Sequence, residues 1–476
     1  MRSLSLRQVA RATGGTLEGS GRLMISGIGI DSRSIKGQDL FVALEGERYD
    51  GHAFLENVSI AGVKAVMVRE GNLHVEKFRK KHPRYPVVLV QDTLRALGDL
   101  AAFVREGLQI RTVGITGSSG KTCTKDLLVS ALRTRWPVAA SPGSFNNEVG
   151  IPLTVFGVEK DDRFLVAEMA ARAPGDIGRL VEIVEPEIGI ITNVGITHLE
   201  LFKSQEGVAS AKAELARSLP ESGKLFLNAD NNWSSWIARR TRARVVRFGY
   251  SRGADYRATG VIIEEGGCPS FTLKGHGFTV DIRLPVPGRH QVENAVAAAA
   301  CAAELGLGPD EILEGFAGVR LTKWRMEVCE APGAYTVIND SYNASPQSMS
   351  AALEALKDVG PDRRTVAVLG YMAELGGESR RYHLEAGRKL VSMDVDILVT
   401  VGKQARDYAE AAVKAGLPRG SVFRSANVTD AAGLLSEIVE PGDVILVKAS
   451  RVMGLESVAE QLMAPDFSLQ KVEANA

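Results

Sequence analysis

The chain has 476 residues, which is too long for one ordinary hydrophobic core and indicates about two to four domains. Hydrophobic residues make up 45% of the chain and charged residues 24%, a composition typical of soluble globular proteins. Lys plus Arg and Asp plus Glu number 57 each, so no overall charge favours nucleic acid or a membrane surface as a partner.

The N-terminal segment and the apolar runs predict a protein that is neither exported nor inserted in a membrane. In residues 1–13, basic residues interrupt every apolar stretch, which predicts an amphipathic helix rather than a signal peptide. The Ala-rich run at 295–303 is far shorter than the ~20 residues that cross a bilayer. The four cysteines lack CxxC or zinc-ligand spacing. We therefore expect a cytoplasmic protein.

Residues 1 to about 110 combine short strands with helices. Apolar runs predict strands at residues 25–30, 39–43, 65–68 and 87–90. This mixture predicts a small α/β domain, 1–110.

From residue 111 the pattern becomes an alternation of strands and helices. Strands are expected at 112–116, 164–167, 188–192 and 224–228. Apolar runs that are bounded by turns and separated by helices favour a parallel sheet covered on both faces. Helical patterns are absent between residues 256 and 284, where Gly-rich turns predict a small antiparallel patch. These features define a second domain, 111–318.

The alternation resumes after residue 320. Strands expected at 335–338, 365–369, 397–401 and 444–448 predict a second doubly wound, Rossmann-like sheet in a third domain, 319–476. The fold class is therefore α/β with three domains, and we expect the residues after Met463 to fray.

The clearest motif is Gly-Ile-Thr-Gly-Ser-Ser-Gly-Lys-Thr at 114–122, between a predicted strand and a predicted helix. Glycines let successive backbone N–H groups point at one anion, and the helix N-terminus adds its dipole. Gly114 lies one residue too early for the strict G-x4-G-K-[ST] pattern, but the context favours ATP binding over a Gly-rich surface turn. Lys121 would reach the phosphates and Thr122 would bind Mg²⁺. The candidate ATP-binding residues are Gly117, Ser118, Ser119, Gly120, Lys121 and Thr122.

Three further residues have two interpretations each when taken alone. Glu168 ends a buried-looking strand beside the phosphate loop, where either a metal ligand or a helix cap is expected. His198 after a strand is more often structural than a ligand. Lys212, on a predicted helix, is by default a surface lysine.

The order and spacing of several motifs resemble the Mur ligase family over essentially the whole chain. Besides the phosphate loop, the motifs are Asn-Asn-Glu-Val-Gly-Ile-Pro-Leu-Thr at 146–154, Thr-Asn-Val-Gly to His at 192–198, Ala-Lys-Ala-Glu at 211–214, Gly-Arg-His-Gln-Val-Glu-Asn at 288–294, Arg325 and Asp-Ser-Tyr-Asn-Ala-Ser-Pro at 340–346. The resemblance implies a first domain for a UDP-sugar, a central ATPase domain and a C-terminal domain for the incoming amine.

The resemblance also implies roles for single residues. Glu168 and His198 would bind a second Mg²⁺, and Lys212 would be a carbamylated lysine near the metal. The nucleotide would be contacted by Asn294 at the adenine and Asn147 near the phosphates, and Arg325 and Asp340 of the third domain would close over it.

Within the family, the chain resembles the members that add D-alanyl-D-alanine to UDP-N-acetylmuramoyl-tripeptide in peptidoglycan synthesis. This resemblance rests on Asp-Ser-Arg at 31–33 with Asp-Gly-His at 50–52, on Tyr-Asn-Ala-x-Pro at 342–346, and on Leu-Gly-Tyr-Met-Ala-Glu-Leu-Gly at 369–376. The implied substrate-binding residues are Ser32, Arg33, Asp50, His52, Tyr342 and Asn343.

The sequence departs from the family pattern at three positions. Ser345, Tyr371 and Cys123 stand where the family usually has Asn, Asp and Thr. None of the three removes a charged catalytic group. The first two bear on the dipeptide pocket.

Three alternatives remain beside a monomeric D-alanyl-D-alanine ligase that uses ATP and Mg²⁺. The chain could be a related ligase that adds another amino acid or glutamate. It could be a P-loop switch or motor, although such proteins do not need Lys212, Asn294 and Arg325 in this arrangement. An inactive carbohydrate-binding relative is disfavoured because Lys121, Glu168 and Asp340 are all present.

Overall fold

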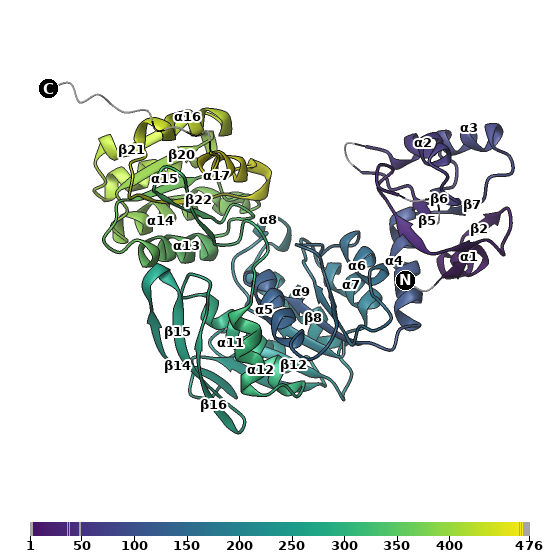
Figure 1. Cartoon of the computed structure of the whole chain (residues 1–476), viewed down its shortest axis with the longest axis horizontal. Helices are drawn as coiled ribbons and strands as arrows, with labels where there is room; N and C mark the ends of the chain where they lie inside the picture. Colours follow the sequence, from purple (N-terminus) through teal and green to yellow (C-terminus); the bar gives the residue numbers. More distant parts are fainter. Residues whose placement is uncertain are drawn as a thin grey trace.

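The computed structural model describes residues 3–35, 37, 39–46, 49–465, 467 and 469. Its strands form four sheets, and the three larger sheets follow one another along a bent line from the N-terminal to the C-terminal part (Figure 1). This arrangement confirms the α/β class. The domain limits near residues 110 and 318 stay predictions, and most residues after Met463, which were expected to fray, lie outside the described part.

The N-terminal part is built on a five-stranded sheet with helices packed against it. Helix α1 (Leu6–Thr13) begins at Ser5, whose hydroxyl accepts a hydrogen bond from the N–H of Gln8, while Gln8 Oε1 accepts one from the N–H of Ser5. This capping box satisfies N–H groups that the first helical turn leaves free. Across the sheet the strands are β2 (Thr16–Glu18), β7 (Val87–Val90), β6 (Ala65–Arg69), β5 (Asp39–Val42) and β4 (Gly27–Gly29).

The strand expected at residues 25–30 is two separate strands. The first, β3 (Met24–Ile25), pairs with β1 (Leu4–Ser5), and the second, β4, pairs with β5. The chain bends at Ser26 between them. Because of this bend, Ile25 is buried in the core against α1, whereas β4 forms the edge of the larger sheet.

The central part contains a nine-stranded sheet whose middle is parallel, as predicted. The antiparallel patch expected at 256–284 is present as three strands at one edge of this sheet, β14, β15 and β16. Two further strands of this sheet, one at 138–140 and one at 244–249, were not predicted. In order across the sheet the strands are β16 (Phe278–Arg283), β15 (Pro269–Gly275), β14 (Tyr256–Ile263), β13 (Arg244–Gly249), β12 (Lys224–Asn228), β11 (Ile188–Ile191), β8 (Arg111–Thr116), β10 (Phe164–Glu168) and β9 (Val138–Ala140).

Helices cover both faces of this sheet because alternate residues of its buried strands point to opposite sides. In β10, Phe164 and Val166 pack with one set of helices, whereas Leu165 and Ala167 pack with the other. The first set is α5 (Lys121–Leu132), α11 (Gln291–Glu304) and α12 (Pro309–Ala317); the second is α6 (Gly150–Phe156), α7 (Asp176–Val184) and α9 (Gln205–Ser218). The second core continues into the N-terminal part through α4 (Thr93–Glu106).

The C-terminal part is a six-stranded sheet that is parallel except at one edge. The four strands expected from the sequence are present within one residue of the expected limits, and the polar edge strands β17 and β21 are additions to them. Across the sheet the strands are β17 (Glu327–Glu330), β18 (Thr336–Asn339), β22 (Val444–Lys448), β19 (Thr365–Leu369), β20 (Ile397–Val401) and β21 (Val422–Ser425). Its two faces pack against α13 (Pro346–Val359), α14 (Ser379–Ser392) and α15 (Arg406–Ala415), and against α16 (Val428–Ile438) and α17 (Glu456–Leu462).

Cys123 and Cys301 are buried, and all four cysteines are free thiols. None of the described helices has the length together with the apolar character that spanning a bilayer requires.

We predict that the substitution Gly315→Ala destabilises the central part. A Cβ at Gly315 on α12 would lie 2.4 Å from the Cα of Ala131 on α5, the helix that begins with Lys121. Overpacking of this kind typically destabilises by about 1–3 kcal/mol. The matched control is Gly318→Ala, where a Cβ would approach nothing closer than 3.8 Å. Calorimetry should show a lower Tm for Gly315→Ala alone, and equal Tm values would contradict the close helix contact.

Candidate active site

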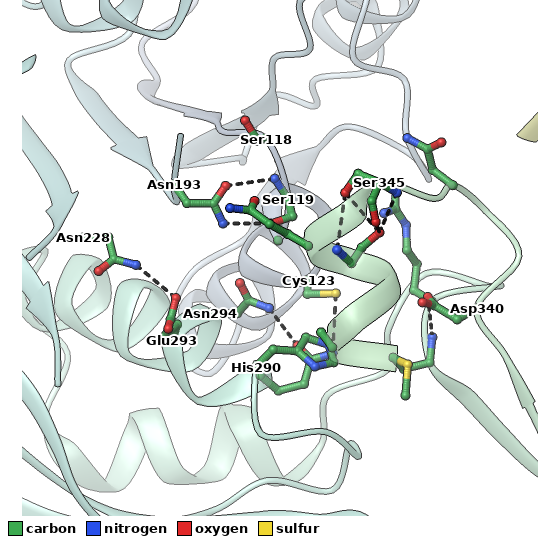
Figure 2. Close-up of a pocket in the computed structure, with 18 of the residues that line it drawn as sticks. Ser118, Ser119, Cys123, Asn193, Asn228, His290, Glu293, Asn294, Asp340 and Ser345 are labelled. Carbon is green, nitrogen blue, oxygen red and sulfur yellow. Dashed lines mark hydrogen bonds between the residues drawn. The ribbon is translucent and has the colours of Figure 1, made fainter. Parts of the chain in front are cut away.

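A cavity of about 340 Å³ lies between the central and C-terminal sheets. Its central wall includes the phosphate loop, Asn193 after β11 and Asn228 at the end of β12, and its C-terminal wall includes Asp340 after β18. In Figure 2, Asp340 and Ser345 lie across the cavity from Ser119 and Asn193. The carboxyl ends of two parallel sheets therefore meet at one site, which is where such sheets bind ligands.

The phosphate loop is held in place by the segment that follows β11. Thr192 Oγ1 donates to the carbonyl of Ser119 at 2.6 Å, and Asn193 both accepts from the Ser119 N–H at 3.0 Å and donates to its hydroxyl at 2.8 Å. Gly117 and Gly120 have φ of 153° and 78°. A Cβ on them would lie 1.9 Å from Thr192 Oγ1 and 2.2 Å from Asn294 Oδ1, so this packing requires glycine at both positions.

Lys121 begins helix α5 directly after this loop. Its Nζ donates to the carbonyl of Gly117 at 2.9 Å. Burial lowers the pKa of Lys121, the charge of Glu168 acts in the opposite direction, and the charge of Arg325 lowers the pKa further. The lysine therefore lies within the electrostatic reach of an acid from the central part and an arginine from the C-terminal part.

Thr122 and Glu168 supply buried oxygen atoms beside the phosphate loop. Glu168 ends β10 in register with Ile115 of β8, and Asn146 donates to its Oε1 at 2.7 Å. Glu168 Oε2 and Thr122 Oγ1 are both buried without a hydrogen-bond partner in the described part of the chain. Buried polar atoms are normally paired, and oxygen ligands are those that Mg²⁺ prefers. Each of these atoms fits the role of a ligand to a divalent cation. Sequence reasoning had not identified Asn146 as the residue that orients Glu168.

His198 and Lys212 occupy different surroundings from those that sequence composition alone suggests. His198 caps α8 (Leu199–Phe202), and its Nδ1 lies 2.5 Å from Oε2 of Glu374 in the C-terminal part. Lys212 is not a surface residue: it is 2% exposed on α9. Burial, followed by the positive charge of Lys121, lowers the pKa of Lys212 to about 7.

Arg325 and Asp340 both line the cavity, and their contact with the nucleotide stays a prediction. The Arg325 guanidinium lies 4.1 Å above the ring of Tyr342, and its buried Nε has no hydrogen-bond partner among the described residues. Asp340 Oδ2 accepts from Lys448 Nζ at 2.5 Å. Lys448, which is 1% exposed at the end of β22, also donates to the carbonyl of Asn343 and was missed in the sequence because it ends an apolar run.

Asn294 and Asn147 have different positions relative to the cavity. Asn294 lines it from α11 and donates to Gln291 Oε1 at 2.9 Å. Asn147 accepts from the N–H of Gly150 at 2.9 Å at the start of α6 and is not among the residues that line the cavity. The structure therefore gives Asn147 a contact with the first residue of α6, and its expected contact with the phosphates stays a prediction.

The side chains at the start of α13 connect the two parts. The hydroxyl of Ser144 donates to the hydroxyl of Tyr342 across the interface. Ser345, one of the departures from the family pattern, lines the cavity and accepts from the N–H of Ser348 at 3.3 Å, which caps the helix. Another departure, Cys123, also lines the cavity, and burial raises the pKa of its thiol, which disfavours the reactive thiolate.

The candidate residues of the N-terminal part lie outside this cavity. Arg33 binds Asp31 through paired contacts of 2.9 and 2.8 Å beside the half-buried Ser32, and these bonds lower the pKa of Asp31 to about 2. His52 is buried, with Nδ1 2.6 Å from Asp50 Oδ1 and Nε2 accepting from the N–H of Arg69 at 2.9 Å. Both ring nitrogens are used within the fold, so His52 orients Asp50. A substrate contact at these positions stays a prediction.

The chain matches three family models that together span most of its length. Residues 24–105 match the Mur ligase family catalytic domain, 115–302 the Mur ligase middle domain, and 324–451 the Mur ligase glutamate ligase domain. The UDP-N-acetylmuramoyl-tripeptide--D-alanyl-D-alanine ligase of Mycobacterium tuberculosis is 38% identical, with 98% of this chain and 99% of the relative covered.

Solved structures agree with these matches. A crystal structure of MurF from Acinetobacter baumannii has a TM-score of 0.87 at 29% identity and covers 97% of this chain and 99% of its own. MurF ligase from Thermotoga maritima in complex with ADP has a TM-score of 0.78 at 28% identity, covering 91% and 96%. The three sheets, the phosphate loop facing Arg325, and these full-length similarities lead to one conclusion: the chain belongs to the Mur ligase family.

Proposed function

We propose that this chain is an ATP-dependent ligase that adds D-alanyl-D-alanine to UDP-N-acetylmuramoyl-tripeptide, giving the UDP-N-acetylmuramoyl-pentapeptide, ADP and phosphate for peptidoglycan synthesis. The main support is the full-length similarity to relatives that bear this activity in their name. The site adds the chemistry, because a phosphate loop on one sheet faces Arg325 and Asp340 on another across one cavity.

The reaction needs an activated acyl group. A carboxylate does not react with an amine at neutral pH, because its carbon is electron-rich and oxide is a poor leaving group. Transfer of the γ-phosphoryl group of ATP to the tripeptide carboxylate gives an acyl phosphate and ADP. The dipeptide amine then attacks the acyl carbon, the amide bond forms, and phosphate leaves with its electron pair while the amine loses a proton.

The first step brings two anions together, so it requires fixed positive charge. Lys121 of the central part and Arg325 of the C-terminal part would supply this charge. Lys121 begins α5 directly after the phosphate loop, and Arg325, which lines the cavity, is held over Tyr342. An acyl phosphate is also hydrolysed by water. A position between the two sheets would shield it from bulk water.

Mg²⁺ fits the oxygen atoms that the site leaves unpaired. Thr122 would hold one ion, and Glu168 with His198 would hold a second; bound there, the ions would neutralise phosphate charge during transfer. Asn146, by donating to Oε1 of Glu168, leaves Oε2 free for the metal.

We infer that Lys212 is carbamylated. A buried ammonium beside Lys121 would repel both that lysine and a metal, and the depressed pKa leaves much of the Lys212 amine neutral near pH 7. The neutral nitrogen would attack CO₂, forming an N–C bond and releasing one proton. The resulting anion would offset the charge of Lys121 and the metal.

The two substrates would bind to different parts of the chain on either side of the central part. We infer that residues 1–110, with Ser32, Arg33, Asp50 and His52, bind the UDP-sugar end, and that residues 319–476, with Tyr342 and Asn343, bind the dipeptide. The central residues 111–318 bind ATP. A cytoplasmic, monomeric enzyme is consistent with these soluble substrates.

The alternatives differ in what they require for phosphate release. A P-loop switch or motor would hydrolyse ATP without the dipeptide, and an inactive relative would release no phosphate. A ligase for another amino acid would use that amino acid in place of the dipeptide. The buried Lys212 and the cavity-lining Arg325 favour a ligase.

With ATP and UDP-N-acetylmuramoyl-tripeptide present, we expect phosphate release only after D-alanyl-D-alanine is added, and mass spectrometry should detect the pentapeptide product. Free D-alanine, L-lysine, meso-diaminopimelate and D-glutamate should compete poorly. D-alanyl-glycine should be used weakly, since one missing methyl group is worth about 1–3 kcal/mol. A single amino acid that proves the better acceptor would contradict the proposed specificity.

The substitution Lys121→Ala should abolish turnover while the fold is kept. Loss of one fixed charge at the transferring phosphoryl group raises the barrier by about 3 kcal/mol or more, which is roughly a 100-fold loss of kcat. Phosphate release and circular dichroism measure the two effects. Lys160→Ala, at an exposed position, is the control that should keep full activity. An unchanged kcat in Lys121→Ala would remove the phosphate-loop assignment.

The substitution Lys212→Ala should be nearly inactive and should recover part of its activity in added acetate, because the short carboxylate can enter the space left by the side chain. Lys212→Arg is the matched variant: it fills the space, cannot be carbamylated under these conditions, and should not respond to acetate. The measurement is the initial rate of phosphate release by both variants with and without acetate. Full activity of Lys212→Ala without acetate would refute carbamylation.

A further inference from the structure

The contact between His198 and Glu374 joins two residues in an uncommon backbone conformation. His198 has φ of 51° and Glu374 has φ of 63°, in the left-handed region that residues other than glycine rarely adopt. Glu374 lies between β19 and α14, in the C-terminal part, and His198 lies between β11 and α8, in the central part. These two loop positions, which follow strands of different sheets, place Oε2 of Glu374 2.5 Å from Nδ1 of His198.

The segment around His198 is seated on the C-terminal part. Ile196 and Leu199 pack against the C-terminal core. A Cβ on Gly195 would lie 1.8 Å from Oε1 of Gln347, and the N–H of Glu200 donates to the carbonyl of Glu374 at 3.4 Å. The histidine therefore lies in the middle of the docking segment 195–200, so its surroundings depend on the C-terminal part being in place.

The contact determines which nitrogen of His198 is available. A ring that donates its Nδ1–H to a carboxylate keeps an unprotonated Nε2, which is the form that binds a metal ion. Phe202 packs edge-on against the ring, with centroids 6.4 Å apart, and restricts its orientation.

We propose that Glu374 is a positioning residue through which docking of the C-terminal part prepares His198 to bind the metal ion. Before docking, the ring of His198 lacks its acceptor; after docking, Glu374 fixes the tautomer that leaves Nε2 free. The metal site is therefore completed only when the part that binds the dipeptide is seated. This inference rests on the metal role of His198 in the proposed function.

The test is a titration of the full chain with Mn²⁺ in the absence of substrates. Electron paramagnetic resonance measures the free Mn²⁺, which gives the Kd. The relevant site is the one that His198→Ala weakens. Glu374→Ala should raise the Kd of this site about 10- to 100-fold, and Glu374→Gln, which keeps an acceptor oxygen without the charge, should fall between it and the unchanged chain. Glu378→Gln is the matched control: this acid lies four residues away and pairs with Arg381, so the Kd should not change.

Two further measurements separate positioning from a general weakening of the docked arrangement. In the His198→Ala background, Glu374→Ala should have no additional effect on Kd, because Glu374 acts through the ring. Nitrogen NMR of the metal-free chain should show the Nδ1–H tautomer of His198, and this signature should be lost in Glu374→Ala.

An unchanged Kd or an unchanged tautomer in Glu374→Ala would overturn the inference. If only Glu374→Ala is without effect while His198→Ala weakens Mn²⁺ binding, the positioning role fails and the proposed metal ligand stands. If neither variant changes the Kd, the metal role of His198 fails as well.

Discussion

The site depends on how closely the phosphate loop packs against the segment after β11 and against α11. Gly117 and Gly120 lie where any Cβ would overlap Thr192 or Asn294. This close packing leaves the loop little conformational freedom, and the N–H groups of Ser118 and Ser119 donate to Asn193, which fixes the loop to the segment after β11. The positions of Lys121 and Thr122 follow from the same packing, because helix α5 starts directly after the loop.

Charge at the site is assembled from elements that belong to different sheets. The central part contributes Lys121 with Glu168 and Lys212 in its electrostatic surroundings, and the C-terminal part contributes Arg325 and the Asp340–Lys448 pair, which line the cavity. A buried charge is costly when unpaired, which explains why Asp340 has Lys448 beside it and why the pKa of Lys212 is depressed. Placing partners on separate sheets links the completion of the site to the docking of the two parts.

Much of the fold could be predicted because the central strands are continuous apolar runs flanked by turns. The parallel strands that were predicted in both larger sheets lie within one residue of their expected limits. Among the missed strands, β9 and β21 are edge strands of three and four residues, too short to show a pattern, and β13 is an interior strand in which Arg244 and Arg247 interrupt the apolar run. The break at Ser26 that divides residues 25–30 into two strands could not be predicted from the local sequence. It depends on the pairing of Ile25 with β1, about twenty residues away in the chain.

The sequence alone determined the features that are local: the phosphate loop, the strand that ends at Glu168, and the motifs that indicate the family. Only the tertiary structure decided the features that depend on partners distant in the chain. Lys448 and Asp340, 108 residues apart, pair because β22 and β18 are neighbours in one sheet. The burial of Lys212 and of His52, and the contact of Glu374 with His198, were decided in the same way. Their side chains have no periodic pattern that signals burial, so their surroundings exist only once the sheets and helices are packed together.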